Sequence, residues 1–158
     1  MATYTTSNDM GGTEQNLSTT YKTLANVLAA ASAQRRGMII SIYAAANGAP
    51  SVSNNVIIDL SSMTANDGTA TTVTATKSDQ ADAAAASTTK VNFTAEGTIG
   101  TAGFLHREFN QLVAYEWEDE LNGIIWPATA NTGFALRSKG QSSGYASTMF
   151  CELGFVEL

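Results

Sequence analysis

From Arg36 onward, hydrophobic residues come in short runs separated by Gly, Asn, Asp, Ser and Pro. The runs are rich in branched and aromatic side chains, which favour extended backbone, and the residues between them are typical of turns. This pattern predicts strands over residues 38–43, 56–60, 71–76, 91–95, 104–109, 112–117, 124–126, 133–137 and 146–156. Short strands at this spacing are typical of two-sheet folds, so we expect an all-β protein with a single, jelly-roll-like β-sandwich.

Two of these strands are expected to pair through a local turn. Residues 64–68 end in Asp67-Gly68, a dipeptide that strongly favours a tight turn between antiparallel strands. We therefore expect 56–60 and 71–76 to form a hairpin.

Two stretches carry a helical pattern. Residues 79–87 begin with Asp79 as a candidate N-cap, have Asp82 three residues later and continue into alanines, which predicts at most a turn or two of helix. In 23–33, positions 24, 27 and 28 fit a helical stripe, whereas positions 21, 23, 25 and 27 alternate as on a strand. We expect a strand there.

The first twenty residues contain very few large apolar side chains. A segment of this composition gains little from burial to offset its ordering entropy. We therefore expect an extended N-terminal arm over 1–20 that contacts a neighbouring molecule, and a β-sandwich domain over 21–158.

The chain has 158 residues, of which only 14% are charged, and a formal net charge of −6. The length suits one domain, and the negative charge opposes direct binding of nucleic acid, because phosphate contacts need a surplus of Lys and Arg. No run of residues is long and apolar enough to cross a bilayer, so no membrane association is expected. With one Cys and one His, the sequence offers no intrachain disulfide and no Cys/His zinc site.

Three glutamates, Glu116, Glu118 and Glu120, alternate with Tyr115, Trp117 and Asp119. On a strand they share one face at a spacing of about 7 Å, which is compatible with the carboxylate pair of an inverting glycosidase. The simpler interpretation places Val113, Tyr115 and Trp117 toward the core and the acids toward water, and we favour it.

Two further residues could act as nucleophile or base. His106 is the sole imidazole, but no Gly-x-Ser-x-Gly elbow accompanies it, and sequence cannot place a serine or an orienting acid beside it. Cys151 has no basic neighbour in sequence that would stabilise a thiolate, so we interpret it as a small buried hydrophobic residue.

Calcium and carbohydrate are the remaining ligand classes. Three aspartates lie in turn-like segments, Asp67, Asp79 and Asp82, but no calcium-loop motif is present, and turn and capping roles explain the same residues. Five aromatic residues could stack on sugars if they were exposed: Tyr43, Tyr115, Trp117, Trp126 and Tyr145. Core packing is the simpler role for them, and we expect no catalytic, cofactor-binding or metal-binding residues.

Three stretches of the chain together resemble small β-sandwich structural proteins from the virions of tailed double-stranded DNA bacteriophages. They are RRGMIISIY at 35–43 with NVIIDL at 55–60, the segment 71–76 with SDQADAA at 78–84, and GIIWPAT at 123–129 running into GFALRS at 133–138. The resemblance implies a capsid decoration or cement protein that binds the major capsid protein or other virion proteins, associates with copies of itself, and lies on the capsid surface after synthesis in the host cytoplasm.

A neutral surface of Thr, Ser, Asn and Ala agrees with this expectation, because such side chains can be buried in repeated contacts at little cost in rotamer entropy or charge desolvation. We therefore expect a non-enzymatic structural protein. The alternative is a carbohydrate-binding or receptor-binding β-sandwich module, and the third candidate is a hydrolase that uses Glu116 and Glu118.

Overall fold

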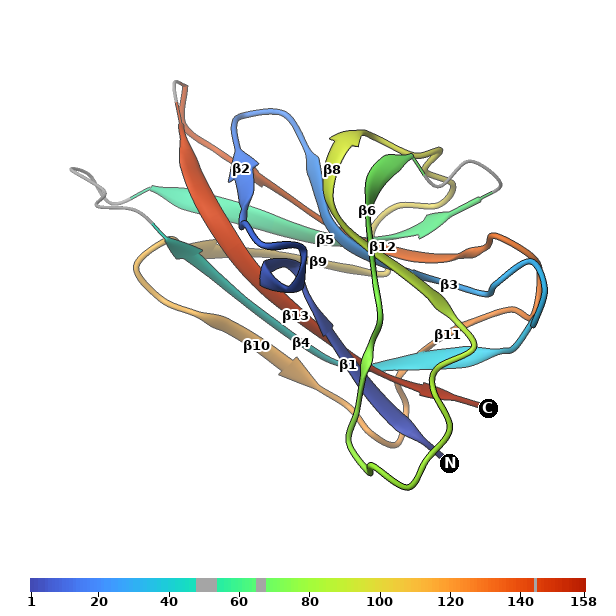
Figure 1. Cartoon of the computed structure of the whole chain (residues 1–158). Coiled ribbons are helices and arrows are strands. Elements are labelled where there is room, and N and C mark those ends of the chain that lie inside the picture. The colour runs from blue at the N-terminus through green and yellow to red at the C-terminus, as the bar shows by residue number, and fades with distance from the viewer. Residues whose placement is uncertain (48–53, 65–67, 144) are drawn as a thin grey trace.

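The strands form two antiparallel sheets that pack face to face in the computed structural model, which describes residues 1–47, 54–64, 68–143 and 145–158 (Figure 1). Sheet A has the order β10 (Tyr115–Glu118), β4 (Gly37–Asn47), β13 (Ser147–Glu157), β1 (Thr3–Ser7) and β7 (Thr76–Lys77), with β11 (Ile124–Trp126) paired to β4 and β2 (Gln15–Leu17) paired to β13. Sheet B has the order β6 (Thr69–Val73), β8 (Thr88–Ala95), β3 (Lys22–Leu28), β12 (Gly133–Gly140), β5 (Asn55–Met63) and β9 (Leu105–Asn110). The expected all-β sandwich is confirmed.

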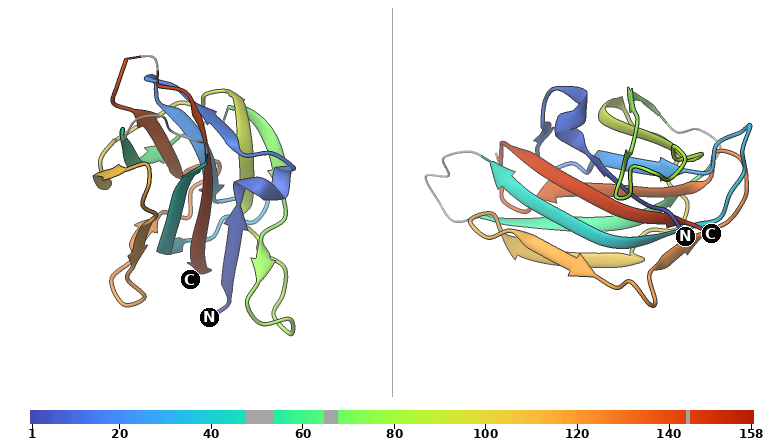
Figure 2. Two further views of the ribbon diagram at one scale, coloured as in Figure 1. Left: turned by 90° about the vertical axis from the view of Figure 1, so that its left-hand side faces the viewer. Right: turned by 60° about the horizontal axis from the view of Figure 1, so that its bottom comes forward.

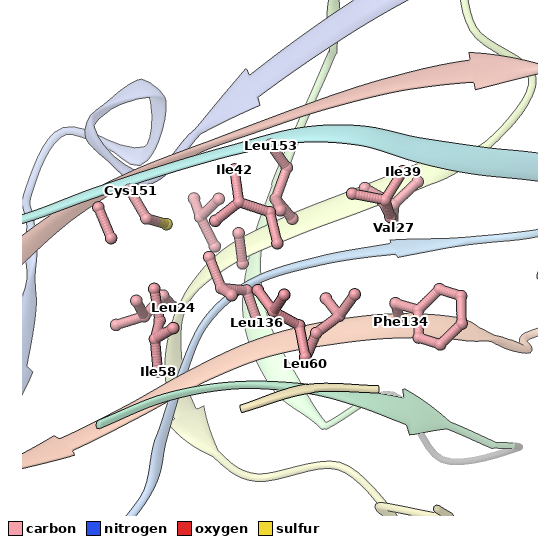
Figure 3. Close-up of a cluster of buried hydrophobic side chains, with 14 of the residues drawn as sticks. Leu24, Val27, Ile39, Ile42, Ile58, Leu60, Phe134, Leu136, Cys151 and Leu153 are labelled. Atoms are coloured by element: carbon pink, nitrogen blue, oxygen red, sulfur yellow. The ribbon is translucent and has the colours of Figure 1, made fainter. Parts of the chain in front are cut away.

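Apolar side chains from the facing sides of the two sheets form the core, as Figure 3 shows. The labelled residues come from both sheets: Leu24, Val27, Ile58, Leu60, Phe134 and Leu136 from sheet B, and Ile39, Ile42, Cys151 and Leu153 from sheet A. The ambiguous segment 23–33 is a strand at its start, β3, and a bulge opposite Leu136 and Arg137 lets neighbouring Leu24 and Ala25 both be buried. The strand alternative is confirmed there.

The expected hairpin between 56–60 and 71–76 is wrong. β5 pairs with β12 and β9, whereas β6 pairs with β8 at the far end of sheet B. Residues 65–67 of the expected turn lie outside the described residues, and Gly68 has a positive φ of 77°. The local turn signal did not decide the pairing, because both edges of β5 are occupied by strands that are distant in sequence.

The first twenty residues belong to the sandwich, which corrects the expectation of a separate arm. β1 pairs with β13 from Thr3 opposite Val156 to Ser7 opposite Glu152. Tyr4 is 2% exposed and stacks on Phe155, with 5.4 Å between ring centroids. Two of the few apolar side chains of the segment, Tyr4 and Leu17, are buried, so they dock it although its overall composition is polar.

A buried asparagine joins the end of β1 to β13. The Asn8 side chain donates a hydrogen bond to the Met149 carbonyl at 2.6 Å and accepts one from the Cys151 amide at 2.9 Å. Asn8 opens a single-turn 3-10 helix (Asn8–Gly11), after which the chain returns to pair β2 with β13. These contacts satisfy backbone groups of β13 where β1 has ended.

Residues 79–87 contain a turn and no helix, which lies within the predicted limit of at most a turn or two of helix. The Asp79 carboxylate accepts a hydrogen bond from the Ala81 amide at 2.9 Å, and the Lys77 ammonium donates to the carbonyls of Gln80 and Asp82, both at 2.8 Å. The side chains of Asp79 and Lys77 thus bind backbone groups that a helix would use, which favours the turn.

Candidate functional site

A hollow of about 390 Å³ lies on the outer face of sheet A. Three neighbouring strands line it: β4 with Ser41, Ile42 and Tyr43, β10 with Glu116 and Glu118, and β13 with Phe150 and Glu152. The register places Glu116 and Glu152 on opposite sides of Tyr43 in one cross-strand row. The next row on this face is Glu118, Ser41 and Gly154.

Two positions of the second row, Ser41 and Gly154, have a small side chain or none. A Cβ atom added to Gly154 would lie 2.1 Å from the Ser41 hydroxyl oxygen, so a larger residue there would require the Ser41 side chain to rotate. Tyr43 lies in the neighbouring row, and its ring contacts the Phe150 ring edge-on with 5.8 Å between centroids. The hollow therefore combines an aromatic wall with carboxylates around it.

The three carboxylates of the hollow have no cationic partner among the described residues. Glu116 and Glu118 are exposed and Glu152 is half-buried. The ion pairs found in the described part of the chain join other groups: Lys22 with Glu96, and Asp59 with both His106 and Arg137. Like charges across neighbouring strands repel each other, so the hollow favours a positively charged guest.

The alternation predicted around Glu116 is only partly right. Tyr115 and Trp117 are half-buried and pack against the core, as expected, but Val113 is exposed. Glu120 follows the end of β10 and does not line the hollow. Its place is taken by Glu152, which sequence spacing could not connect with Glu116, because β4 lies between their strands. A general acid and base need unlike environments, whereas Glu116 and Glu118 are both exposed on one strand.

A second polar cluster lies on the outer face of sheet B around Asp59, which is 3% exposed. Arg137 of β12 donates to Asp59 Oδ1 at 2.9 Å, and His106 Nδ1 of β9 lies 3.0 Å from Asp59 Oδ2. Burial raises the pKa of Asp59, but the hydrogen bonds it accepts and the charge of Arg137 outweigh burial and leave this pKa below its ordinary value.

The cluster places His106 beside an orienting acid, but it does not form a nucleophile–base pair. The Ser61 hydroxyl donates to Asp59, and Arg137 Nε donates to the Ser61 oxygen at 3.1 Å. A serine nucleophile must donate its proton to the imidazole. This geometry instead links β5, β9 and β12 through one buried carboxylate.

Arg137 and Lys139 also contact an aromatic ring that the sequence did not single out. Their charged groups lie 4.6 Å and 4.8 Å from the ring centroid of Tyr21, which precedes β3. Arg137 and Lys139 are two positions apart on β12, so the sequence alone could have placed both cations on the same outer face of sheet B. These contacts explain the two cations as parts of the sheet B surface.

Cys151 is fully buried in the core, as interpreted from the sequence. Burial raises the pKa of its thiol. It faces the opposite sheet among aliphatic side chains (Figure 3). The thiol therefore acts as a small apolar group.

The other candidate ligand residues are dispersed. Trp126 and Tyr145 are buried, which leaves Tyr43 as the member of the predicted aromatic set that lines the hollow. Among the candidate calcium ligands, Asp67 lies outside the described residues. Across the described ranges, no group of three or more His, Cys, Asp or Glu side chains is arranged to hold a metal ion.

A scan of protein-family models and a search of curated proteins found no match to this chain. Within the described residues, no helix is both long and apolar enough to cross a membrane.

Proposed function

We propose that this protein is a non-enzymatic structural component of a tailed-phage virion, a capsid decoration protein that binds the capsid shell and neighbouring copies. The resemblance over residues 35 to 158 motivates the virion setting. The observation that carries a contact role is a set of exposed apolar side chains spread along one edge of the sandwich.

This edge is formed by β10 and β11, which both pair with β4 and have no strand on their other side in the described chain. Four large apolar side chains flank or belong to it and are 46% to 89% exposed: Leu112, Val113, Leu121 and Ile125. Figures 1 and 2 show β10 at the rim of its sheet. We call these four residues with the two strands the apolar edge.

Exposed apolar side chains beside unpaired strand backbone favour contact with another protein. Burying one aliphatic side chain contributes about 1.5 to 3 kcal/mol. Few charges would be desolvated elsewhere, because only 14% of the residues are charged. The apolar edge therefore supports attachment to a protein surface without any chemistry.

Rebinding to virions tests this proposal. The triple variant L112S/V113S/L121S should fold normally, because these side chains are exposed, and should lose binding to particles stripped of the protein. Leu158→Ser is the matched control, since Leu158 is 46% exposed and lies outside the apolar edge. Full rebinding of the triple variant would overturn the role of this edge.

The alternative, a carbohydrate-binding module, is supported by one observation, the Tyr43 wall of the hollow beside three carboxylates. Trp126 and Tyr145, which could have extended a stacking platform, are buried. A glycan array probed with the purified protein tests this alternative.

A further inference from the structure

We infer that the acidic hollow of sheet A receives the Arg35-Arg36 pair of a second copy of this chain. The inference deepens the proposed structural role by naming a partner for the hollow, and it rests on that role for its biological setting. Its physical basis is that one molecule carries both an unpaired set of carboxylates and an unpaired pair of guanidinium groups.

Arg35 and Arg36 lie at the end of the segment between β3 and β4, and both are exposed. Neither side chain donates a hydrogen bond or forms an ion pair in the part of the chain that the structure describes. The other six of the eight basic residues all have partners: Lys22, Lys77, Lys90, Arg107, Arg137 and Lys139.

The backbone at the arginine pair is held in place while its side chains are exposed. The Leu158 amide donates to the Arg36 carbonyl at 2.9 Å. Next to it, a Cβ atom on Gly37 would lie 2.0 Å from the buried Trp126 ring, so this position is packed against the core. A fixed backbone reduces the entropy that the arginines lose on binding.

The hollow matches a guanidinium in both charge and shape. Glu116 and Glu152 lie two strand spacings apart, about 10 Å between backbones, with the Tyr43 ring between them. A planar guanidinium can stack on an aromatic ring while its N–H groups donate to carboxylates on either side. Glu118 lies one row away and can accept from the second arginine.

The contact must form between molecules. Arg36 precedes Tyr43 by seven positions on the same extended chain, about 23 Å, so the pair cannot fold back into its own hollow. Each copy then offers one arginine pair and one hollow. Such a head-to-tail contact closes into a ring or continues as a chain of copies, which suits repeated placement on a particle.

Charge reversal of each partner tests the inference with the purified, full-length chain. We expect the wild type to self-associate in sedimentation velocity between about 10 µM and 1 mM protein, more strongly at about 50 mM than at about 500 mM salt. R35E/R36E and E116K/E118K should each weaken association by about tenfold or more. The controls are Lys139→Glu, on the outer face of sheet B, and Glu120→Lys, just after the end of β10; each reverses a charge outside the contact.

Mixing provides the decisive result. R35E/R36E retains a normal hollow and E116K/E118K retains a normal arginine pair, so an equimolar mixture should form heterodimers at concentrations where each variant alone is monomeric. A chain carrying all four substitutions should associate again. A monomeric wild type over the whole range, or an R35E/R36E variant that associates as the wild type does, would overturn the inference. Glycan binding that E116K/E118K abolishes, without any change in association, would assign the hollow to carbohydrate instead.

Discussion

Removing the Tyr4 side chain should destabilise the whole domain if the N-terminal segment is part of the sandwich. Tyr4 is 2% exposed, stacks on Phe155, and its hydroxyl donates to the Ala83 carbonyl at 3.2 Å. Truncating a buried aromatic side chain to alanine costs about 3 to 5 kcal/mol. The stack accounts for about 0.5 to 1.5 kcal/mol and the hydrogen bond for about 1 kcal/mol of that loss.

Thermal and urea unfolding followed by circular dichroism measure this effect. For a domain of this size, the loss corresponds to a decrease of about 6 to 20 °C in Tm. Tyr4→Phe should recover most of the stability, and Thr20→Ala, at an exposed position of the same segment, should leave Tm unchanged. A Tyr4→Ala variant that melts within about 2 °C of the wild type would mean that residues 1–20 are a separable arm.

Three further predictions follow from the packing and the Asp59 cluster. The pKa of Asp59 is lowered in the folded state, so its contribution to stability is present above its ordinary pKa of 3.8 and is lost as the pH falls through the lower folded value. Asp59→Asn should therefore reduce the free energy of unfolding at pH 7 and flatten its decline in acid. Urea titrations at several pH values measure both effects. Gly37→Ala should destabilise by about 2 kcal/mol or more, because the new Cβ would overlap Trp126, and a normal urea midpoint would contradict this contact. Cys151 should react with a thiol reagent only at the rate of global unfolding, and fast labelling of the native protein would contradict its burial.

The strands could be predicted from the sequence because alternation and turn residues are local properties. All nine expected runs contain residues that form strands, and even the ambiguous segment 23–33 begins as β3. Pairing is a long-range property, and here local signals misled. The Asp67-Gly68 signal predicted a hairpin, whereas β6 found its partner in β8.

The sequence also failed to predict how the N-terminal segment docks and which distant residues meet in the two polar clusters. Composition predicted an extended arm over 1–20 that contacts a neighbouring molecule, but a few inward-facing residues such as Tyr4 and Leu17 were enough to dock it on its own sandwich. Arg137 reaches Asp59 across 78 residues of sequence. Asp59 itself, a lone charge in the apolar run 56–60, was the one available signal that a partner existed. No feature of the sequence around Glu152 indicated that it lies near Glu116.

Quantitative mass spectrometry of purified virions tests the proposed function most directly. The particles should come from a phage whose genome encodes this chain, and they should be purified by density gradient to remove host proteins. We predict that the chain is present in many copies per particle, in a fixed ratio to the major capsid protein, and that it is lost together with the capsid surface layer. Its absence from infectious particles, with the chain recovered only from the lysate, would contradict the proposal that it is a structural virion protein.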